Sequence, residues 1–361
     1  MLVRRLWLTD FRSYATADVS LSSGVTAILG ANGQGKTNLL EGLAYVATLD
    51  SFRGAPVDAL IRAGSNAAVV RAECDAEGRA VLIEAELSAT GRGRVYVNKQ
   101  RLQRTRDLLG ALRVTVFAPD DLELVKGAPS GRRRFLDDTL VALHSRHDQL
   151  RGDLDRVLRQ RNTLLKQAAG GNRFDESAAF TLEVWDAKLI ELGEALAAAR
   201  RDLVATLEPL LQDTYAAVAG DASALVTATY EAPWMAEGLA AALVRVRKDE
   251  LRRGVTLVGP HRDDLDVHLN GLPSRTHASQ GEQRSLAFAL RLAAHRLVTS
   301  ETGAPPVLLL DDVFSELDPE RSDALLAHLP TGQTVLTSAA GLPPRAQPDR
   351  VLYIDNGQIH G

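Results

Sequence analysis

The sequence predicts an α/β protein whose sheet-containing part is interrupted by a long helical segment. Three observations support this prediction. Residues 67–98 contain short β-rich runs separated by polar turns, which is typical of an antiparallel meander. Residues 132–219 carry almost no strand pattern. The C-terminal third alternates apolar strands with helices, which is typical of a mostly parallel sheet.

The N-terminal elements follow from two hydrophobic periodicities. Alternation at Leu6 and Leu8 predicts a first strand, and the apolar run 25–29 predicts a second one after a turn at 22–24. Apolar residues at helical spacing then predict a helix over 37–48.

The later elements are derived in the same way. Apolar stripes predict two long helices between 132 and 219, joined by a turn at 168–172. Strand patterns return downstream, and Asn270-Gly271 is typical of a hairpin turn. The expected strands are 224–230, 255–258, 265–269, 307–310, 334–337 and 351–354, and the expected helices of the last third are 281–299 and 319–329.

The composition of the 361 residues is that of a globular protein. It is 45% hydrophobic and 24% charged, which excludes disordered, collagen-like and disulfide-stapled classes. Cys74 is the only cysteine, so an intramolecular disulfide is excluded, a reducing compartment is favoured, and we expect a buried, inert thiol. Because no stretch reaches the ~20 apolar residues of a membrane span, we expect a cytoplasmic protein with no membrane partner.

The strongest local motif lies between the strand 25–29 and the helix that follows it. The motif fits G-x-x-x-x-G-K-[ST], in which backbone N–H groups converge on phosphate oxygens because glycines leave no Cβ in the way. Lys36 would neutralise the β- and γ-phosphates, and the Thr37 hydroxyl would ligate Mg²⁺. The alternative is an ordinary glycine-rich turn. The expected nucleotide-binding residues are Gly30, Ala31, Asn32, Gly33, Gln34, Gly35, Lys36, Thr37 and the adjoining Asn38.

A buried strand that ends in two carboxylates favours an ATPase among P-loop proteins. The run 307–310 precedes Asp311 and Asp312, as expected for a strand parallel to the P-loop strand that delivers acids to the metal. Asp311 would hold Mg²⁺, and Asp312 would polarise the attacking water, so Lys36 and Asp312 are the predicted catalytic residues. In isolation, such a pair is as often a helix cap or a solvated turn.

Two other nucleotide-binding signatures and a metal cluster fit less well. A GTPase would carry Asn-Lys-x-Asp, but the only Asn-Lys, at 98–99, lacks the Asp. A kinase catalytic loop is excluded because His268 stands where Asn is required, five residues after Asp263. The His and Asp residues within 261–268 could suggest a metal site, but alternation on a strand would splay them to opposite faces, which favours a polar strand edge.

A second anion-binding motif lies at Ser279, Gln280 and Gly281, before a helix. In isolation, Ser279 with Glu282 is only a capping box. Together with the acidic pair downstream, the segment resembles the signature motif of ABC-type ATPases, in which Ser279 and Gly281 would bind ATP held by a second copy. The segment 315–318 resembles the D-loop of the same proteins.

Taken together, the motifs resemble those of the RecF family, bacterial recombination mediators related to the heads of SMC proteins. The resemblance implies an ABC-type P-loop ATPase head, with a mixed sheet and an antiparallel β-meander, interrupted by a helical arm domain. It covers essentially the whole chain and rests on residues 11–14, 30–45, 51–53, 117–137, 259–265, 279–293 and 308–318. The implied domains are 1–130 with the P-loop, 131–245 as the helical arm, and 246–361 with the signature and acidic motifs.

The same resemblance implies a function in DNA repair, DNA replication and the SOS response to DNA damage. The chain would dimerise on duplex DNA with ATP and Mg²⁺, hydrolyse ATP slowly as a DNA-stimulated ATPase, and help to load recombinase at single-strand gaps. RecR, RecO, a second copy of the chain and DNA at single-strand/double-strand junctions are the implied partners. Two alternatives stay open: the ATPase subunit of a transporter, and a nucleotide-gated scaffold without significant turnover.

Two positions depart from many ABC ATPases. Asp312 stands where Glu is common, as it does in RecF-like proteins, which leaves its role as a base less defined. The segment 334–340 has no switch histidine, and Thr337 or Ser338 are the residues that could take a weaker version of that role.

Basic residues cluster on the helical segment. Ten Arg or Lys and five Asp between 130 and 173 give it a charge of +5, so the rest of the chain, whose total is −4, carries −9. A second basic group lies at 245–253. Such clustering without aromatic residues predicts contacts with DNA phosphates, whereas the alternative is a solvated helix face. The expected DNA-binding residues are Arg132, Arg133, Arg134, Arg156 and Arg159.

Overall fold

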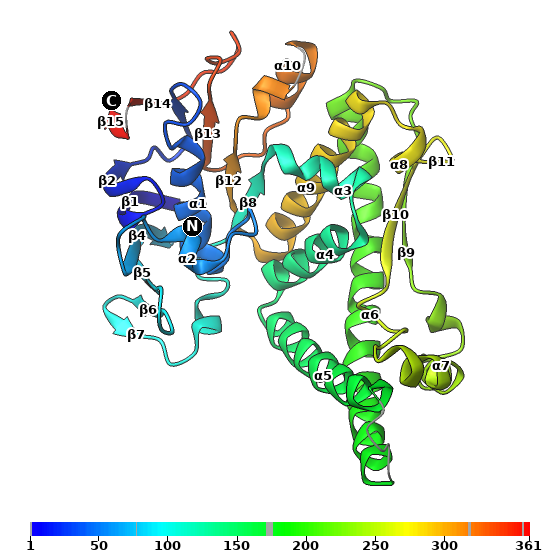
Figure 1. Cartoon of the computed structure of the whole chain (residues 1–361). Helices are drawn as coiled ribbons and strands as arrows, with labels where there is room; N and C mark the ends of the chain where they lie inside the picture. The colour runs from blue at the N-terminus through cyan, green and yellow to red at the C-terminus, as the bar shows by residue number, and fades with distance from the viewer. Residues whose placement is uncertain (1, 77, 171–175, 317–318, 356) are drawn as a thin grey trace. The chain divides into compact units, whose positions relative to one another are not determined.

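The chain divides into two compact units, which are described separately. The computed structural model describes residues 2–76, 78–170, 176–316, 319–355 and 357–361 (Figure 1). Unit 1 comprises Met1–Leu122, Asp213–Ala224 and Ser279–Gly361, and unit 2 comprises Glu123–Gln212 and Leu225–Ala278. The division by contacts thus joins residues 246–278 to the helices of the arm, whereas the sequence-based arm ends at 245.

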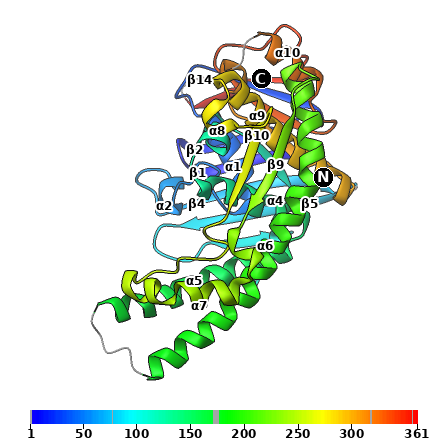
Figure 2. The ribbon, with the colours of Figure 1, turned by 90° about the vertical axis from the view of Figure 1, so that its right-hand side faces the viewer.

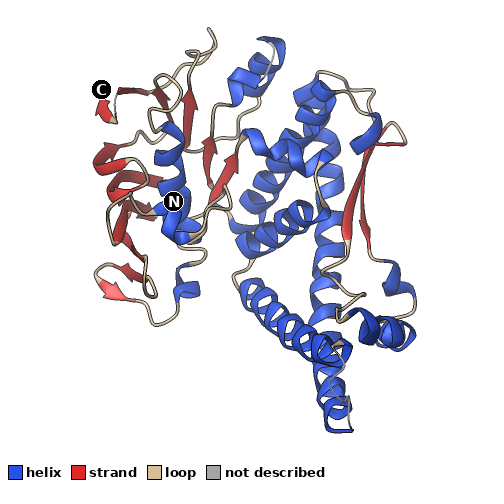
Figure 3. Cartoon of the chain, in the orientation of Figure 1, coloured by secondary structure: helices blue, strands red, loops and turns tan. Residues whose placement is uncertain are grey.

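Unit 1 contains two six-stranded sheets, whose strands are red in Figure 3. Its strands are β1 Leu2–Phe11, β2 Tyr14–Ser20, β3 Val25–Leu29, β4 Ala67–Ala76, β5 Arg79–Ser88, β6 Arg94–Val97, β7 Gln100–Arg101, β8 Val114–Phe117, β12 Val307–Leu310, β13 Thr334–Ser338, β14 Arg350–Asp355 and β15 Gln358–His360. Its helices are α1 Lys36–Thr48, α2 Val57–Leu60, η1 Thr105–Leu108, η2 Pro119–Leu122, α9 Gln280–Thr302, η4 Val313–Glu316 and α10 Pro319–Ala327, together with the end of α6 (Glu176–Ala219).

The first sheet has the order β2-β1-β4-β5-β6-β7 and is antiparallel, so the predicted meander is confirmed. Strand β2 was not predicted. Only its first residue and Val19 have buried side chains, and the polar residues between them conceal the alternation. Cys74 lies in β4 with no exposed surface, so the expected burial is confirmed, and this burial raises the pKa of its thiol to about 12, which disfavours the reactive thiolate.

The second sheet has the order β15-β14-β3-β13-β12-β8, and all neighbours from β14 to β8 are parallel. Only β15 is antiparallel to its neighbour. The predicted parallel sheet is therefore confirmed. Because carboxyl ends of parallel strands lie at one edge of a sheet, β3 and β12, separated by β13, deliver their following loops to the same edge.

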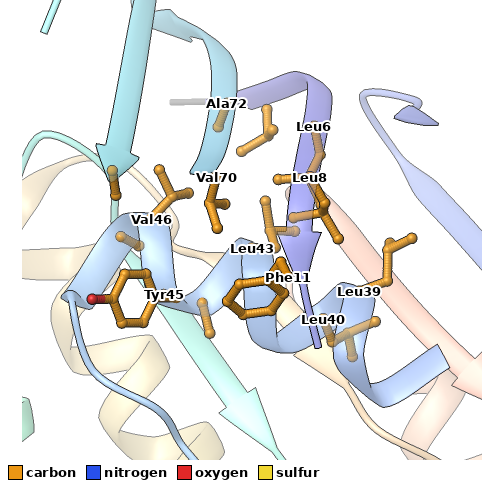
Figure 4. Packing of buried hydrophobic residues seen from close by; sticks show 14 of the residues in the cluster. Leu6, Leu8, Phe11, Leu39, Leu40, Leu43, Tyr45, Val46, Val70 and Ala72 are labelled. Atoms are coloured by element: carbon orange, nitrogen blue, oxygen red, sulfur yellow. The ribbon is translucent and has the colours of Figure 1, made fainter. Parts of the chain in front are cut away.

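Helix α1 lies between the two sheets and joins their cores. Leu39, Leu40 and Leu43 are fully buried and face the side chains of β1 and β4, among them Leu8 and Phe11 (Figure 4). A Cβ at Gly42 would lie 2.7 Å from Leu8 Cδ2, so this glycine permits the close approach of α1 to β1. The beginning of α1, at Lys36, is thereby fixed on two buried surfaces.

Unit 2 is mainly helical and carries a small antiparallel sheet, β11-β10-β9. Its helices are α3 Glu123–Lys126, α4 Pro129–Leu143, α5 Arg146–Ala169, most of α6, η3 Pro233–Ala236, α7 Leu239–Arg253 and α8 Ser274–His277, and its strands are β9 Val226–Glu231, β10 Asp264–Leu269 and β11 Leu272–Pro273. Helix α7 packs along α5 (Figure 2). The expected hairpin turn at Asn270-Gly271 is confirmed by positive φ angles of 53° and 77°.

Two expectations about unit 2 were wrong, and one helix was missed. The stretch 132–219 contains three helices because His144, with φ −144° and ψ 114°, ends α4. Residues 255–258 form no strand, because the backbone N–H and the hydroxyl of Thr256 both donate to Asn162 Oδ1, at 2.7 Å each. Helix α7 was not predicted. The turn expected at 168–172 lies partly outside the described residues.

A buried ion-pair network holds the helices of unit 2 together. Arg161 on α5 has no exposed surface and donates to Asp186 on α6 at 2.8 Å and to Glu250 on α7 at 2.6 Å. Asp186 also pairs with Arg247. Removing one member of such a buried pair typically costs about 3–5 kcal/mol, because the other charge is left uncompensated. The network therefore fixes α5, α6 and α7 against one another.

None of the helices within the described ranges is long and apolar enough to cross a membrane.

Candidate nucleotide-binding site

The P-loop connects β3 to α1, as the sequence predicted, and its glycines are required by geometry. Gly35 has φ 104°, and a Cβ there would lie 2.9 Å from Tyr14 Oη and 3.0 Å from Ser13 Oγ. Tyr14 Oη donates to Gly35 O at 3.1 Å, so the close approach forms a hydrogen bond. Ser13 and Tyr14 therefore support the loop backbone at Gly35. Ala31, Asn32 and Gly33, at the tip of the loop, are exposed.

The segment 11–14 also supports the first turns of α1. Asn38 Nδ2 donates to Ser13 Oγ at 2.9 Å. Arg12 forms a two-pronged pair with the fully buried Glu41, with Nε–Oε2 and Nη2–Oε1 distances of 2.7 and 2.8 Å. The sequence indicates no role for this segment beyond a family motif, and the structure shows that it positions the P-loop and α1.

The side chain of Lys36 folds back onto the backbone of the P-loop. Its Nζ donates to Gly30 O at 2.7 Å and to Ala31 O at 2.9 Å, and the residue is 5% exposed. An ammonium group has three N–H donors, so two are held by the loop and one is left to face an anion. The side chain is thus directed into the loop that a phosphate chain would occupy.

Asp311 and Thr37 meet at the carboxyl ends of the parallel strands. Thr37 Oγ1 donates to Asp311 Oδ1 at 2.9 Å, and Thr337 Oγ1 donates to the same oxygen at 2.9 Å. Asp311 is 5% exposed, and burial raises its pKa, although the two hydroxyl hydrogen bonds act in the opposite direction. The structure therefore brings together the two residues that the sequence analysis assigned to the metal.

Asp312 is held in place by hydrogen bonds with Thr337 and Ala339. It has a positive φ of 48°, its N–H donates to Thr337 Oγ1 at 2.9 Å, and its Oδ1 accepts from Ala339 N at 3.2 Å. Its carboxylate is thus fixed beside β13. Thr337 bridges both acids, a role that its sequence position indicates only by lying at the end of the strand next to the acidic strand.

The signature segment lies at the start of α9. Ser279 Oγ accepts from Glu282 N at 3.3 Å, and Ser279 N donates to Glu282 Oε2 at 2.7 Å, which is a complete capping box. Helix α9 packs on β8, three strands from β3, which is about 14 Å across the sheet at about 4.8 Å per strand. In the D-loop candidate, Ser315 Oγ donates to Asp312 O at 2.7 Å, and residues 317–318 lie outside the described residues.

The predicted DNA-binding residues separate into two groups. Arg132 is 4% exposed and forms a two-pronged pair with Asp264, with distances of 2.7 and 2.8 Å, so its assignment to DNA is corrected: the guanidinium is used inside unit 2. Arg133 donates to Asp263 O at 2.8 Å and is half-buried. The exposed residues of the set are Arg134, Arg156 and Arg159.

The segment 259–265 has a structural role and holds no metal cluster. Asp263 accepts from Tyr230 Oη at 2.6 Å and from Trp234 Nε1 at 2.7 Å, and Pro260 O accepts from Arg200 at 2.7 Å. Within the described part of the chain, no group of three or more His, Cys, Asp or Glu side chains could hold a metal ion. The polar residues of this segment therefore lock α4, α6 and the small sheet together.

Comparisons with known proteins identify relatives of this chain. The family described as "RecF/RecN/SMC N terminal domain" matches residues 2–336. The chain is 46% identical over 353 residues to the DNA replication and repair protein RecF of Streptomyces avermitilis, with 94% of both chains covered. It is 41% identical over 372 residues to RecF of Acidothermus cellulolyticus, with 100% of this chain and 99% of the relative covered.

Two solved structures are similar in fold to this chain. The recombination mediator protein RecF with ATP, described as part of the RecFOR pathway, is similar with a TM-score of 0.90 and 28% identity, covering 99% of this chain and 97% of that one. An Smc head domain from Pyrococcus furiosus shares the fold, with a TM-score of 0.59 and 17% identity, covering 99% of this chain and 95% of that one.

Proposed function

Because this chain belongs to the RecF family of DNA replication and repair proteins, we propose that it binds ATP with Mg²⁺, dimerises in the ATP-bound state on DNA, and hydrolyses ATP slowly. The observation that carries this proposal is the meeting of Lys36, Thr37 and Asp311 at one edge of the parallel sheet. The family membership argues against the ATPase subunit of a transporter. A measurement of ATP hydrolysis distinguishes the proposed ATPase from a nucleotide-gated scaffold, which would bind ATP without significant turnover.

The residues at this edge fit a triphosphate with Mg²⁺. Mg²⁺ prefers oxygen ligands and is usually held by one or two protein side chains together with substrate phosphates. Thr37 Oγ1 and Asp311 Oδ1 are such oxygens, 2.9 Å apart. When bound, the ion would neutralise charge on the β- and γ-phosphates. Lys36 would exchange its loop carbonyls for phosphate oxygens, and Gly30–Asn38 would surround the phosphates with N–H groups.

Asp312 is the residue we assign to activation of water. Its carboxylate is anchored by Ala339 N, and the residue directly follows Asp311, so β12 and β13 fix its position relative to Asp311. A carboxylate there would orient the attacking water and accept its proton. We propose that hydrolysis is slow because Asp is shorter than the Glu found in many ABC ATPases.

The signature segment supports a site completed by two copies. Helix α9 packs on β8, three strands from the P-loop strand, which supports our proposal that Ser279 and Gly281 bind the nucleotide of another chain. The Ser279 hydroxyl accepts a hydrogen bond from Glu282 N and also interacts with the Glu282 carboxylate, whose pKa it lowers; in the dimer, its O–H would turn to a phosphate oxygen instead. ATP would then stabilise the dimer by its preference for that state, and hydrolysis would release it.

The DNA-binding surface that we propose lies on α5 and α7 of unit 2, together with Arg134. Arg156 and Arg159 are exposed on α5, and Lys248 and Arg253 are exposed on α7, which packs along α5. Arg156 shares its charge with Asp153 at 2.8 Å. Cations without aromatic residues fit the sugar-phosphate backbone of duplex DNA. Action at single-strand/double-strand junctions, association with RecR and RecO, and a cytoplasmic location complete the proposal.

The test is the ATPase rate with and without duplex DNA at several protein concentrations. The proposal predicts a rate per chain that rises with concentration and with DNA. A charge-reversed variant, Arg156→Glu with Arg159→Glu, should lose the DNA stimulation, whereas Arg345→Glu, in another part of the chain, should retain it. A rate that is independent of DNA and of concentration would contradict the dimeric DNA-stimulated ATPase, and no turnover at all would favour the scaffold.

A further inference from the structure

A guanidinium group lies on the signature segment. A Cβ built on Gly281 would be 2.7 Å from Arg321 Nη1, 3.0 Å from Nη2 and 3.1 Å from Cζ. Arg321 belongs to α10, and both residues are in unit 1. Glycine at position 281 thus makes room for a side chain of the same copy, because the guanidinium of Arg321 occupies the space that a Cβ would need.

Arg321 lies beside the polar groups of the signature. Glu282, which closes the capping box, has a lowered pKa, chiefly because it accepts hydrogen bonds from Ser279 and in part because Arg321 is near. Ser279 and Gln280 are exposed, and Gly281 is partly exposed. We define the signature surface as Ser279, Gln280 and Gly281 with the partly exposed Arg321 beside them; it combines a hydroxyl group, the N-terminus of a 23-residue helix and a guanidinium group.

We propose that Arg321 is a second phosphate-binding residue of the signature surface and contacts the γ-phosphate of ATP held by the P-loop of a second copy. This inference rests on the proposed function. A guanidinium is planar, permanently charged and able to donate two parallel hydrogen bonds to phosphate oxygens. ADP has no γ-phosphate, so the contact exists only in the ATP state and contributes to the preference of ATP for the dimer.

Substitutions of Arg321 separate a charge contact from a packing contact. Arg321→Gln keeps a planar polar head over Gly281 and removes the charge, whereas Arg321→Lys keeps the charge and loses the fork. Arg345 pairs with Asp323 on the same helix α10 at 3.2 Å and supplies the matched control, Arg345→Ala. Thermal unfolding of every variant shows whether the fold is retained.

The experiment is sedimentation with ATP or ADP over a range of salt concentrations. We expect Arg321→Gln and Arg321→Ala to weaken ATP-driven dimerisation by about 10- to 100-fold and to reduce its salt dependence, because charged hydrogen bonds are lost. The strength of ATP-driven dimerisation of Arg321→Lys should lie between that of these variants and that of the wild type. Arg345→Ala should dimerise as the wild type does.

A double-mutant cycle with Gly281→Ala tests the same contact from the other side. Alone, Gly281→Ala should weaken dimerisation because its methyl group displaces the guanidinium. In the Arg321→Ala background it should have little further effect. Wild-type dimerisation with ATP together with undiminished dimerisation of Arg321→Gln would overturn this inference alone. A wild-type chain that stays monomeric with ATP would overturn the proposed function and this inference together.

Discussion

The hydroxyl group of Thr337 connects the two acidic residues of the site, and its removal tests that arrangement. It donates to Asp311 Oδ1 and accepts from Asp312 N, both at 2.9 Å, and the residue has no exposed surface. Thr337→Val keeps the shape and removes both hydrogen bonds. A hydrogen bond to a charged group contributes about 1.5–3 kcal/mol, and a buried N–H left without a partner costs about 1–3 kcal/mol. Because Asp311 keeps its bond from Thr37, we expect a loss of about 2–4 kcal/mol in the free energy of unfolding.

The same substitution should change the pH dependence of Mg²⁺-ATP binding. Burial raises the pKa of Asp311, and the Thr337 bond opposes that effect, so Thr337→Val should raise the pKa further. The carboxylate is protonated as pH falls through its pKa and then ceases to be a metal ligand. Binding by the variant should therefore weaken at a higher pH than binding by the wild type.

Urea unfolding and Mg²⁺-ATP titrations between pH 5 and 8 would measure both effects, with Thr337→Ser as the control. The serine keeps the hydroxyl and loses one methyl group, for which we expect about 1 kcal/mol. If Thr337→Val were as stable as Thr337→Ser and bound Mg²⁺-ATP with the same pH profile, the hydroxyl would not organise the acidic pair, and this reasoning would be refuted.

Three further predictions concern single side chains. Lys36→Met should abolish ATP binding, measured by calorimetry, because it removes the cation directed into the P-loop; unchanged affinity would exclude the site. Asp312→Asn should bind ATP without hydrolysing it and accumulate as a dimer, and normal turnover would exclude its role. The buried Cys74 thiol, with its pKa raised to about 12, should react with a thiol reagent at pH 8 only after unfolding, and rapid labelling of the folded protein would contradict that burial.

The parts of the site that could be predicted from the sequence are those encoded locally. The P-loop residues, the strand before Asp311 and the capping box at Ser279 each lie within one short segment, where spacing and residue type determine the geometry. The bond between Thr37 and Asp311 followed only because the alternation of strands and helices implied a parallel sheet, whose strand ends lie at one edge.

The parts that could not be predicted depend on partners distant in the chain. Arg132 counted as a free cation in the charge total, but Asp264, 132 positions away, uses that charge in the interior. Arg321 has no distinguishing sequence pattern, and only the fold brings its guanidinium to Gly281, which lies 40 positions earlier in the chain. Residues 255–258 have the composition of a strand, yet Asn162 on α5 takes the hydrogen bonds that a strand would need. Charge and periodicity do not report such long-range contacts.

Completion of each ATP site by two copies of the chain can be tested by sedimentation, with ATP, of two variants and of their mixture. Ser279→Arg places a bulky cation on the signature and should retain ATP binding by the single chain, and Lys36→Met lacks a working P-loop. We expect each variant alone to stay monomeric, whereas the equimolar mixture should form dimers, because one intact P-loop then faces one intact signature. Dimerisation of Ser279→Arg alone, to the same extent as the wild type, would exclude an ATP site shared by two copies and leave Ser279 as a helix cap.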